Sequence, residues 1–345
     1  MKGTALCCLA AASCLLSTAL AGQQPAAAQS VAEFYKGRNV SILVGVAPGG
    51  GSDTFARFLS QHLSAHMPGN PSFIVQHMPG AGGINALNHI YNTGSKDGTA
   101  TILTAPSHTL AQIISGKNIR YDLLKMNLLG TLTRDTTSCA ASGRSGIKSI
   151  MDAVDREIIV GATGPDASSA QQSRLLSKLL GLKIKIVTGY RGTAPVRLAM
   201  EAGEVDVVCS FWASQALGPQ KGDMDAGRLV PIVQMGSKPH PAFGKAPVAY
   251  ELAKSEEDRK IMRVVFGTTE LSRPYLAPPG VPADRVAALR SAFWSGVTSA
   301  EAKADAERLR IILDPLDWEG TVKELRDIIE APKEIVEKAR TAVAR

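Results

Sequence analysis

The sequence has 345 residues, with 38 Lys and Arg against 31 Asp and Glu, and charged residues make up 20% of it. This length and composition fit a globular protein with room for two lobes, and they exclude a disordered or fibrous chain. The mild positive surplus favours anionic small molecules, and nucleic acid is not expected as a partner because the Lys and Arg residues form no dense run.

Residues 1–28 are predicted to form a secretory signal peptide. Residues 5–21 are apolar without a single charge, and three alanines at 26–28 provide a small-residue cleavage site. Lipoprotein processing at Cys14 is a less favoured alternative, because the residue three positions before it is not a large aliphatic one. Beyond this segment no apolar run reaches membrane-spanning length, so an exported, soluble mature chain is expected.

The next segment is predicted to form a strand, a glycine turn and a helix. Residues 40–46 are an apolar, β-branched run typical of a buried strand, and residues 48–51 (PGGG) end it. Apolar residues recur at helical spacing after Asp53, and Ser52 or Asp53 is the expected N-cap. Free backbone N–H groups at this helix start predict an anion site, with a simple tight turn as the alternative.

Two details of this segment narrow its interpretation. Thr54 stands where a dinucleotide motif needs its third glycine, and no Gly-Lys-Ser/Thr follows, so neither nucleotide motif is present. Asp53 would repel an anion if it faced the ligand. We therefore expect it to support the turn structurally, paired with Arg57 four residues later.

The pattern then repeats along the chain. A strand at 71–78 precedes a second glycine turn at 79–83, a helix at 84–92 and a strand at 99–104. This alternation predicts an α/β fold with a largely parallel sheet, whose turns open on one edge. Ser107 and His108 follow the third strand, where His108 could line a cleft or be a satisfied loop histidine.

A second lobe is predicted from the same alternation. Strands are expected at 158–162, 183–188 and 204–211, and helices at 167–180 and 193–201, with small-residue turns at 163–166 and 190–192. The runs 128–132 and 230–235 are interpreted as crossings, which gives lobe 1 as 29–130 plus 236–345 and lobe 2 as 131–235. Helices at 283–297, 300–309 and 320–344 follow an extended segment at 274–282, and Pro332 could split the last one.

No metal, cofactor or catalytic group is expected. His62 and His66 share a helix face but lack the base of an H-E-x-x-H enzyme, and two mature cysteines cannot form a zinc-finger-type site. Cys139 and Cys209 could form a disulfide in an oxidising compartment or be buried separately. The sequence holds no nucleophile elbow and places no His and acid beside a candidate serine, so an enzyme is disfavoured.

Other side chains allow two interpretations each. Ser168 and Ser169 could cap their helix or bind a ligand oxygen, and Phe211 and Trp212 could wall a pocket or pack in the core. Arg191 and Arg273 are candidate partners for a carboxylate or ordinary surface arginines.

Taken together, the motifs resemble the substrate-binding proteins of tripartite tricarboxylate transporters, the Bug family. The matching blocks are APGGGSD (47–53) with the Ala-Arg pair at 56–57, PGAGG (79–83), DGT (97–99), GATGPDASS (161–169), YRGTAP (190–195), GEVDVV (203–208) and APPGVP (277–282). Their order and spacing cover essentially the whole mature chain.

The resemblance implies a fold similar to type II periplasmic binding proteins, with two α/β lobes, two hinge crossings and a ligand cleft between the lobes. It implies a periplasmic, monomeric receptor that catalyses no reaction and delivers a small carboxylate (a di- or tricarboxylate or an aromatic acid) to a membrane permease. Signalling to a sensor kinase is the alternative, and an exported hydrolase is less favoured.

By position, the resemblance implies a set of ligand-binding residues in each lobe: Gly49, Gly50, Gly51 and Ser52 in one, and Thr163, Ser168, Ser169, Tyr190 and Thr193 in the other. Further candidates at the same strand ends are Pro48, Gly82, Ser107, Gly192, Phe211, Trp212 and Arg273. The family usually has an aromatic-rich segment where this chain has residues 271–275 (LSRPY), and an Arg there could select a second carboxylate.

Overall fold

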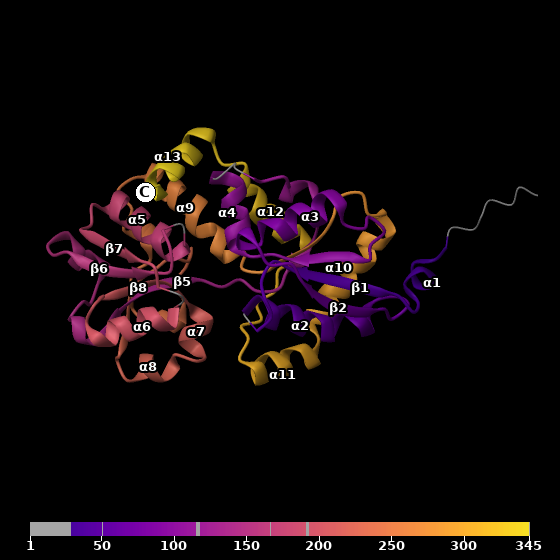
Figure 1. Cartoon of the computed structure of the whole chain (residues 1–345), viewed down its shortest axis with the longest axis horizontal. Helices are drawn as coiled ribbons and strands as arrows, with labels where there is room; N and C mark the ends of the chain where they lie inside the picture. The colour runs from indigo at the N-terminus through magenta and orange to yellow at the C-terminus, as the bar shows by residue number, and fades with distance from the viewer. Residues whose placement is uncertain (1–28, 50, 115–117, 166, 191–192, 345) are drawn as a thin grey trace, which may run out of the picture.

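Two α/β lobes lie side by side, each built on a five-stranded sheet (Figure 1). The computed structural model describes residues 29–49, 51–114, 118–165, 167–190 and 193–344. The predicted signal peptide and the candidate residues Gly50, Arg191 and Gly192 lie outside the described residues. The two-lobed α/β architecture expected from the sequence is confirmed.

Lobe 1 contains a mixed sheet in the order β2-β1-β3-β10-β4. Its first three strands are parallel, and β10 inserts antiparallel between β3 and β4, although it comes from much later in the sequence. The strands are β1 (Asn39–Val44), β2 (Ser72–His77), β3 (Ala100–Leu103), β4 (Asn127–Thr131) and β10 (Pro274–Ala277).

Helices cover both faces of this sheet, and the apolar run of β1 explains why. Val40, Ile42 and Val44 are buried on the side of α2 and α10, whereas Leu43 is buried on the side of α3 and α4. The helices that follow the lobe 1 strands or complete this half are α1 (Val31–Tyr35), α2 (Gly51–Leu63), α3 (Ile84–Thr93), α4 (Pro106–Ile114), α9 (Glu256–Glu270), α10 (Ala283–Thr298), α11 (Ala300–Leu309), α12 (Trp318–Ile329) and α13 (Lys333–Val343).

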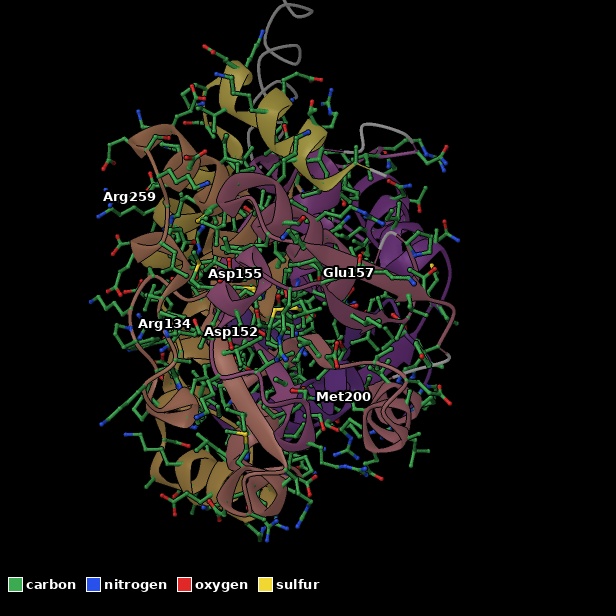
Figure 2. The ribbon with its side chains drawn as sticks, turned by 90° about the vertical axis from the view of Figure 1, so that its left-hand side faces the viewer. Arg134, Asp152, Asp155, Glu157, Met200 and Arg259 are labelled. Atoms are coloured by element: carbon green, nitrogen blue, oxygen red, sulfur yellow. A yellow bond between two sulfur atoms is a disulfide. The ribbon has the colours of Figure 1, made fainter. Side chains whose placement is uncertain are left out.

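Lobe 2 repeats the arrangement with the order β7-β6-β8-β5-β9. Strands β6, β7 and β8 are parallel, and β5 runs antiparallel to both β8 and β9. The elements are β5 (Thr137–Ser142), β6 (Ile158–Ala162), α5 (Ser168–Leu180), β7 (Ile184–Thr188), α6 (Thr193–Ala202), β8 (Val207–Trp212), α7 (Ala213–Leu217), α8 (Lys221–Asp225) and β9 (Leu229–Gln234). The acidic residues Asp155 and Glu157 are exposed on the outer end of this lobe (Figure 2).

The runs 128–132 and 230–235 are mostly strand and not crossings, which corrects the interpretation from sequence. They form the edge strands β4 and β9, because each apolar run is long enough to pair along one side of a sheet. The chain leaves lobe 1 just after β4, whereas after β9 it first returns to lobe 2, where Val248 bridges Gln234 and Phe243 packs against Phe211. The first crossing is braced by a second segment, since Thr131 pairs with Leu316 and Thr133 with Asp314.

Two helices connect the lobes at one side of the molecule. Helix α9 contacts α4 of lobe 1 and α5 of lobe 2, and α13 contacts the same two helices (Figure 1). Pro332 separates α12 from α13, as expected from its missing N–H. Because α9 and α13 contact both lobes, the boundaries 29–130 plus 236–345 and 131–235 stay a prediction. Among the described residues, no helix has the length and apolarity needed to cross a membrane.

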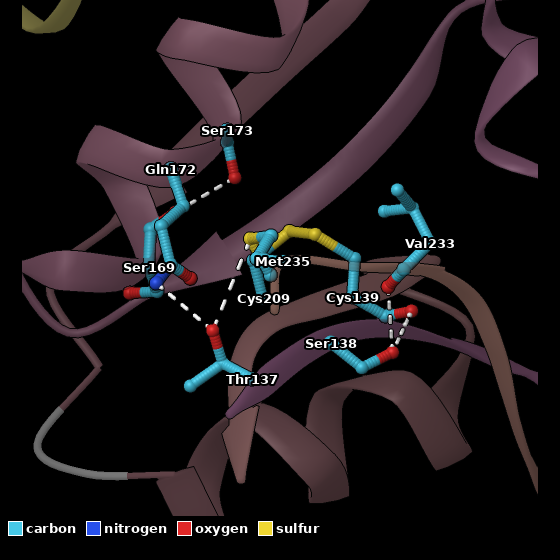
Figure 3. Close-up of a disulfide and its surroundings, with 9 residues drawn as sticks. All are labelled: Thr137, Ser138, Cys139, Ser169, Gln172, Ser173, Cys209, Val233 and Met235. Atoms are coloured by element: carbon cyan, nitrogen blue, oxygen red, sulfur yellow. Dashed lines mark hydrogen bonds between the residues drawn. A yellow bond between two sulfur atoms is a disulfide. The ribbon is translucent and has the colours of Figure 1, made fainter. Parts of the chain in front are cut away.

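Cys139 and Cys209 form a disulfide between neighbouring strands β5 and β8 (Figure 3). Both residues are fully buried, and the bond closes a sequence separation of 70 residues. Of the two alternatives for these cysteines, a disulfide or two separately buried residues, the structure shows the disulfide, and the bond cross-links two neighbouring strands of the lobe 2 sheet.

Candidate ligand-binding site

The first glycine turn is held by a buried carboxylate. Asp53 is only 4% exposed, and its Oδ2 accepts hydrogen bonds from the Gly49 amide at 2.8 Å and from Arg57 Nε at 3.0 Å. The ring of His77, at the end of β2, lies 2.8 Å from Oδ1. The Gly49 hydrogen bond, followed by those of Arg57 and His77, lowers the pKa of Asp53 to about 2.

The start of α2 differs slightly from the sequence prediction. The helix begins at Gly51, so neither Ser52 nor Asp53 is its N-cap. Asp53 lies inside the first turn and reaches back to the Gly49 amide, which keeps its charge directed at the turn backbone. The predicted pair of Asp53 with Arg57 is present. The second partner of Asp53, His77, was not predicted from the sequence.

The second glycine turn has an unusual backbone. Residues Gly80, Ala81, Gly82 and Gly83 all have positive φ, and Ala81 does so despite its side chain. Gly83 packs directly on Gly45 at the end of β1, where an added Cβ on Gly45 would lie 2.5 Å from the Gly83 Cα. The second turn is therefore packed against the residue that follows β1, at a point where neither backbone carries a side chain.

His108, on α4, fixes this second turn. Its Nδ1 accepts a hydrogen bond from the Ala105 amide at 3.1 Å, and its Nε2 lies 2.9 Å from the Gly82 carbonyl oxygen. A carbonyl can only accept, so Nε2 carries the proton and the ring is neutral. Burial lowers the pKa of His108 to about 4. Of its two interpretations, the satisfied histidine is the one that the contacts support.

Arg273 lies where β10 begins, beside the first turn. Its Nη2 is 3.8 Å from the position that a Cβ on Gly51 would take, and its guanidinium lies 5.0 Å from the Phe55 ring centre. Nη1 donates to the carbonyl and hydroxyl oxygens of Ser272 at 2.7 and 3.1 Å. Burial lowers the pKa of Arg273 to about 10, which leaves it charged at neutral pH.

Lobe 2 carries a cavity of about 340 Å³ at the carboxyl ends of β6 and β8. Its described lining consists of hydroxyl, amide, indole and small apolar side chains, with no charged side chain among them. The lining residues are Gly161, Ala162, Thr163, Ala167, Ser168, Ser169, Val196, Val208, Cys209, Ser210, Trp212 and Gln215.

The N-terminus of α5 opens into this cavity. Ala167 is the N-cap, and within the described residues no side chain caps this end, so Ser168 and Ser169 do not serve as caps. The next turn is anchored to the sheet, since Gln172 Nε2 donates to Thr137 Oγ1 at 3.1 Å beside the disulfide (Figure 3). The helix start therefore presents backbone N–H groups and two serine hydroxyls to a solute.

Ser210 is a lining residue that sequence reasoning missed. It follows Cys209 in β8, has a φ of 60°, and lies where the pairing of β5 with β8 is interrupted by a bulge. Bulges and positive φ re-aim side chains at functional sites. Gln215 was also missed; its Oε1 accepts from the Trp212 amide at 3.0 Å.

The remaining candidates fall in different places. Phe211 does not line this cavity but packs against Phe243 in the core, while Tyr190 lies beneath it, with its ring close to Gly161. Thr193 begins α6, and Ser107 is exposed on the first turn of α4. Pro48, Gly49, Gly51 and Gly82 are exposed at the two glycine turns, with Ser52 partly exposed.

Asp135 lies near both halves of the site. Asp135, in the first crossing, is buried and accepts a hydrogen bond from Ser214 Oγ at 2.8 Å. Ser214 precedes Gln215 of the lobe 2 cavity, and the charge of Asp135 acts on Arg273 of lobe 1. Asp135 is therefore hydrogen-bonded beside the cavity wall and close enough to Arg273 for its charge to act there.

Two other cavities have no lining residue from the glycine turns or from the ends of β6 and β8. One of about 530 Å³ lies on lobe 2 near α7 and α8, and its lining includes Lys148, Lys245 and the Lys221–Asp225 pair. Another of about 210 Å³ beside the crossings has three carboxylates in its lining: Asp135, Glu270 and Asp314. Within the described residues, no group of His, Cys, Asp and Glu is arranged to hold a metal ion.

Comparison with solved structures finds the same fold in known solute-binding proteins. The chain matches a TctC solute-binding protein from Polaromonas with a TM-score of 0.68 and 19% identity, over 88% of this chain and 99% of that one. It has the fold of the TctC-type periplasmic binding proteins. MatC from Rhodopseudomonas palustris, solved with malate, matches with a TM-score of 0.61 and 21% identity over 89% and 99%.

A second R. palustris structure, solved with adipate, matches with a TM-score of 0.63 and 18% identity over 88% of this chain and 97% of that one. A sequence relative, the UPF0065 protein in the TAR-I ttuE-ttuC' intergenic region of Agrobacterium vitis, is 26% identical over 184 residues. That match covers 51% of this chain and 52% of the relative, about half the length of each. No family model matches the chain. The predicted type II fold is confirmed, and these names agree with the resemblance found in the motifs.

Proposed function

We propose that this chain is a periplasmic solute receptor that binds a small organic carboxylate between its lobes and delivers it to the permease of a tripartite tricarboxylate transporter. The observation that carries the proposal is the lobe 2 cavity, whose described lining offers hydroxyl, amide and helix N-terminal donors without a charged side chain. Such donors hold a carboxylate without a buried counter-ion. The malate and adipate of the structural neighbours are acids of this kind.

Lobe 1 would supply the second half of the site. Its two glycine turns follow the parallel strands β1 and β2 and are rigidly fixed by Asp53 and His108. Ligands of α/β sheets bind beyond the carboxyl ends of parallel strands. Closure of the lobes around the acid would produce the form that the permease reads.

The described part of the chain gives little support to hydrolysis. Among the described lining residues of the lobe 2 cavity there is no histidine or carboxylate that could act as a base for Ser168, Ser169 or Ser210. Signalling to a sensor kinase uses the same binding step. Co-purification of the ligand-loaded protein with permease subunits, or with a kinase, separates the two roles.

A thermal-shift screen against a library of small carboxylic acids tests the binding step, because a ligand of the native state raises the Tm. We expect at least one acid to raise the Tm and to give a Kd by titration calorimetry. Ser168→Ala should weaken that acid about 5- to 10-fold by removing one hydrogen-bond donor from the cavity. Ser177→Ala, at the far end of α5, is the matched control. A library without a single hit would overturn the proposal.

A further inference from the structure

Arg273 carries a charge that no carboxylate of the described residues balances in an ion pair. Among the described residues it forms no ion pair, and its buried Nε has no hydrogen-bond partner. Its contacts are two oxygens of Ser272 and the face of Phe55, none of which carries a negative charge. A buried guanidinium without a carboxylate is costly, so such groups are nearly always paired.

The nearest acidic influence does not satisfy it. Among the described residues, Asp135 is the carboxyl whose charge favours the charged form of Arg273 and raises its pKa. Its oxygens, however, are occupied by the Thr136 amide and by Ser214 Oγ, both at 2.8 Å, and burial raises the pKa of Asp135. Asp135 is therefore hydrogen-bonded to Thr136 and Ser214 and forms no ion pair with the Arg273 guanidinium.

The Nη2 end of Arg273 lies beside the first glycine turn of lobe 1. Its Nη2 approaches the first residue of α2, Gly51, which is exposed and has no side chain to block it. The residue as a whole keeps part of its surface accessible, although Nε is buried. An anion lying at the first turn would meet the start of α2 and the guanidinium together.

We propose that Arg273 is the specificity-determining residue that binds a second carboxylate, so that this receptor prefers dicarboxylates to monocarboxylates of the same carbon number. The inference rests on the proposed function, because it assigns the second charge of the same ligand. The lobe 2 cavity holds one carboxylate with neutral donors and needs no balancing charge. A second carboxylate on the ligand would balance the positive charge of Arg273 in lobe 1.

The test is calorimetry with matched acid pairs: succinate against butyrate, and adipate against hexanoate. The wild-type protein should bind each diacid at least about 10-fold more tightly than its partner. Arg273→Gln should weaken the diacids about 10- to 100-fold and change the monoacids less than about threefold. Arg290→Gln removes another partly buried arginine, which donates to the Leu128 carbonyl away from the turns, and serves as the matched control.

A second pair of variants keeps the test independent of the folding of Arg273→Gln. Gly51→Asp places a carboxylate next to the guanidinium as an internal competitor, and the backbone of Gly51 is helical with no other atom close to an added Cβ among the described residues. Gly51→Asn is its uncharged counterpart. We expect the Asp variant to weaken diacids at least about 10-fold more than the Asn variant.

The outcomes separate the two proposals. If the wild-type protein binds none of the acids in the pairs or in the wider library, the proposed function fails. If acids bind but Arg273→Gln weakens mono- and diacids equally, or neither, the receptor function stands and the second-carboxylate inference is overturned. Equal effects of Gly51→Asp and Gly51→Asn would overturn it in the same way.

Discussion

Mild acid should destabilise the protein through His108. The neutral ring accepts from the Ala105 amide and donates to the Gly82 carbonyl, so a second proton on Nδ1 would break one contact and place a charge in the core. Burial, aided by the charge of Arg273, lowers the pKa of His108 from 6.5 to about 4. An unfolded chain takes up that proton near pH 6.5 instead.

The size of the effect follows from this difference. Between pH 6.5 and about 4 the unfolded state binds more protons, so the stabilisation is complete above pH 6.5 and is lost as the pH falls towards 4. A difference of 2.5 pKa units corresponds to about 3 kcal/mol, of which about 2 kcal/mol should be lost by pH 5.

Urea unfolding of the wild-type protein and of His108→Gln, measured from pH 7.5 to pH 5, checks this. Glutamine cannot be protonated there, and its amide can still donate to the Gly82 carbonyl. The stability difference between the two proteins should shrink by about 2 kcal/mol across the range. The exposed His66→Gln serves as a control for the loss of a histidine. Parallel curves for wild type and His108→Gln would refute the reasoning.

Three further results are expected, each from urea unfolding. Gly83→Ala should lower the free energy of unfolding by about 2–4 kcal/mol, because φ is +94° and the new Cβ would collide with the buried His108 ring. Gly82→Ala, with φ +65° and open space around the new Cβ, should cost only about 1 kcal/mol. Equal costs for the two variants would contradict the collision. Asp53→Asn should lower the free energy of unfolding by about 2 kcal/mol at pH 7, because the pKa of this carboxylate is lowered from 3.8 to about 2 in the folded protein. The difference from wild type should vanish as the pH falls from about 4 towards 2. A difference that does not depend on pH would contradict a stabilising role for the charge of Asp53. Replacing Cys139 and Cys209 together by Ala should cost about 4 kcal/mol, because the bond closes a separation of 70 residues. The reduced wild-type protein is the matched control, and a variant as stable as the oxidised wild type would contradict this contribution of the bond.

The regular parts of the fold were predictable because their patterns are local. The run from Val40 to Val46 has the composition of a strand buried on both faces, and Pro332 ends a helix by chemistry alone. Strand order was not predictable in the same way. The insertion of β10 between β3 and β4 pairs it with two strands that lie far earlier in the sequence, and no local pattern encodes such a pairing.

The candidate site shows the same division. Glycine turns and serines at helix starts are visible in a sequence, because the residue type itself carries the property that the site needs. The orientation of Ser210 depends on a bulge between two strands that are distant in sequence, and His77 becomes a partner of Asp53 only because β2 pairs with β1. The unpaired state of Arg273 is also a tertiary property, since any nearby carboxylate could have balanced it.

The disulfide has a consequence for how the protein matures. Cys139 and Cys209 meet only when β5 and β8 are paired in their native register, because a slip of one residue would turn one sulfur to the opposite face of the sheet. The intervening chain contains β6, α5, β7 and α6, so the bond can close only after nearly the whole of lobe 2 has been made. The closed bond therefore holds β5 and β8 in their native register, and a count of free thiols reports the fraction of molecules in which this cross-link has not formed.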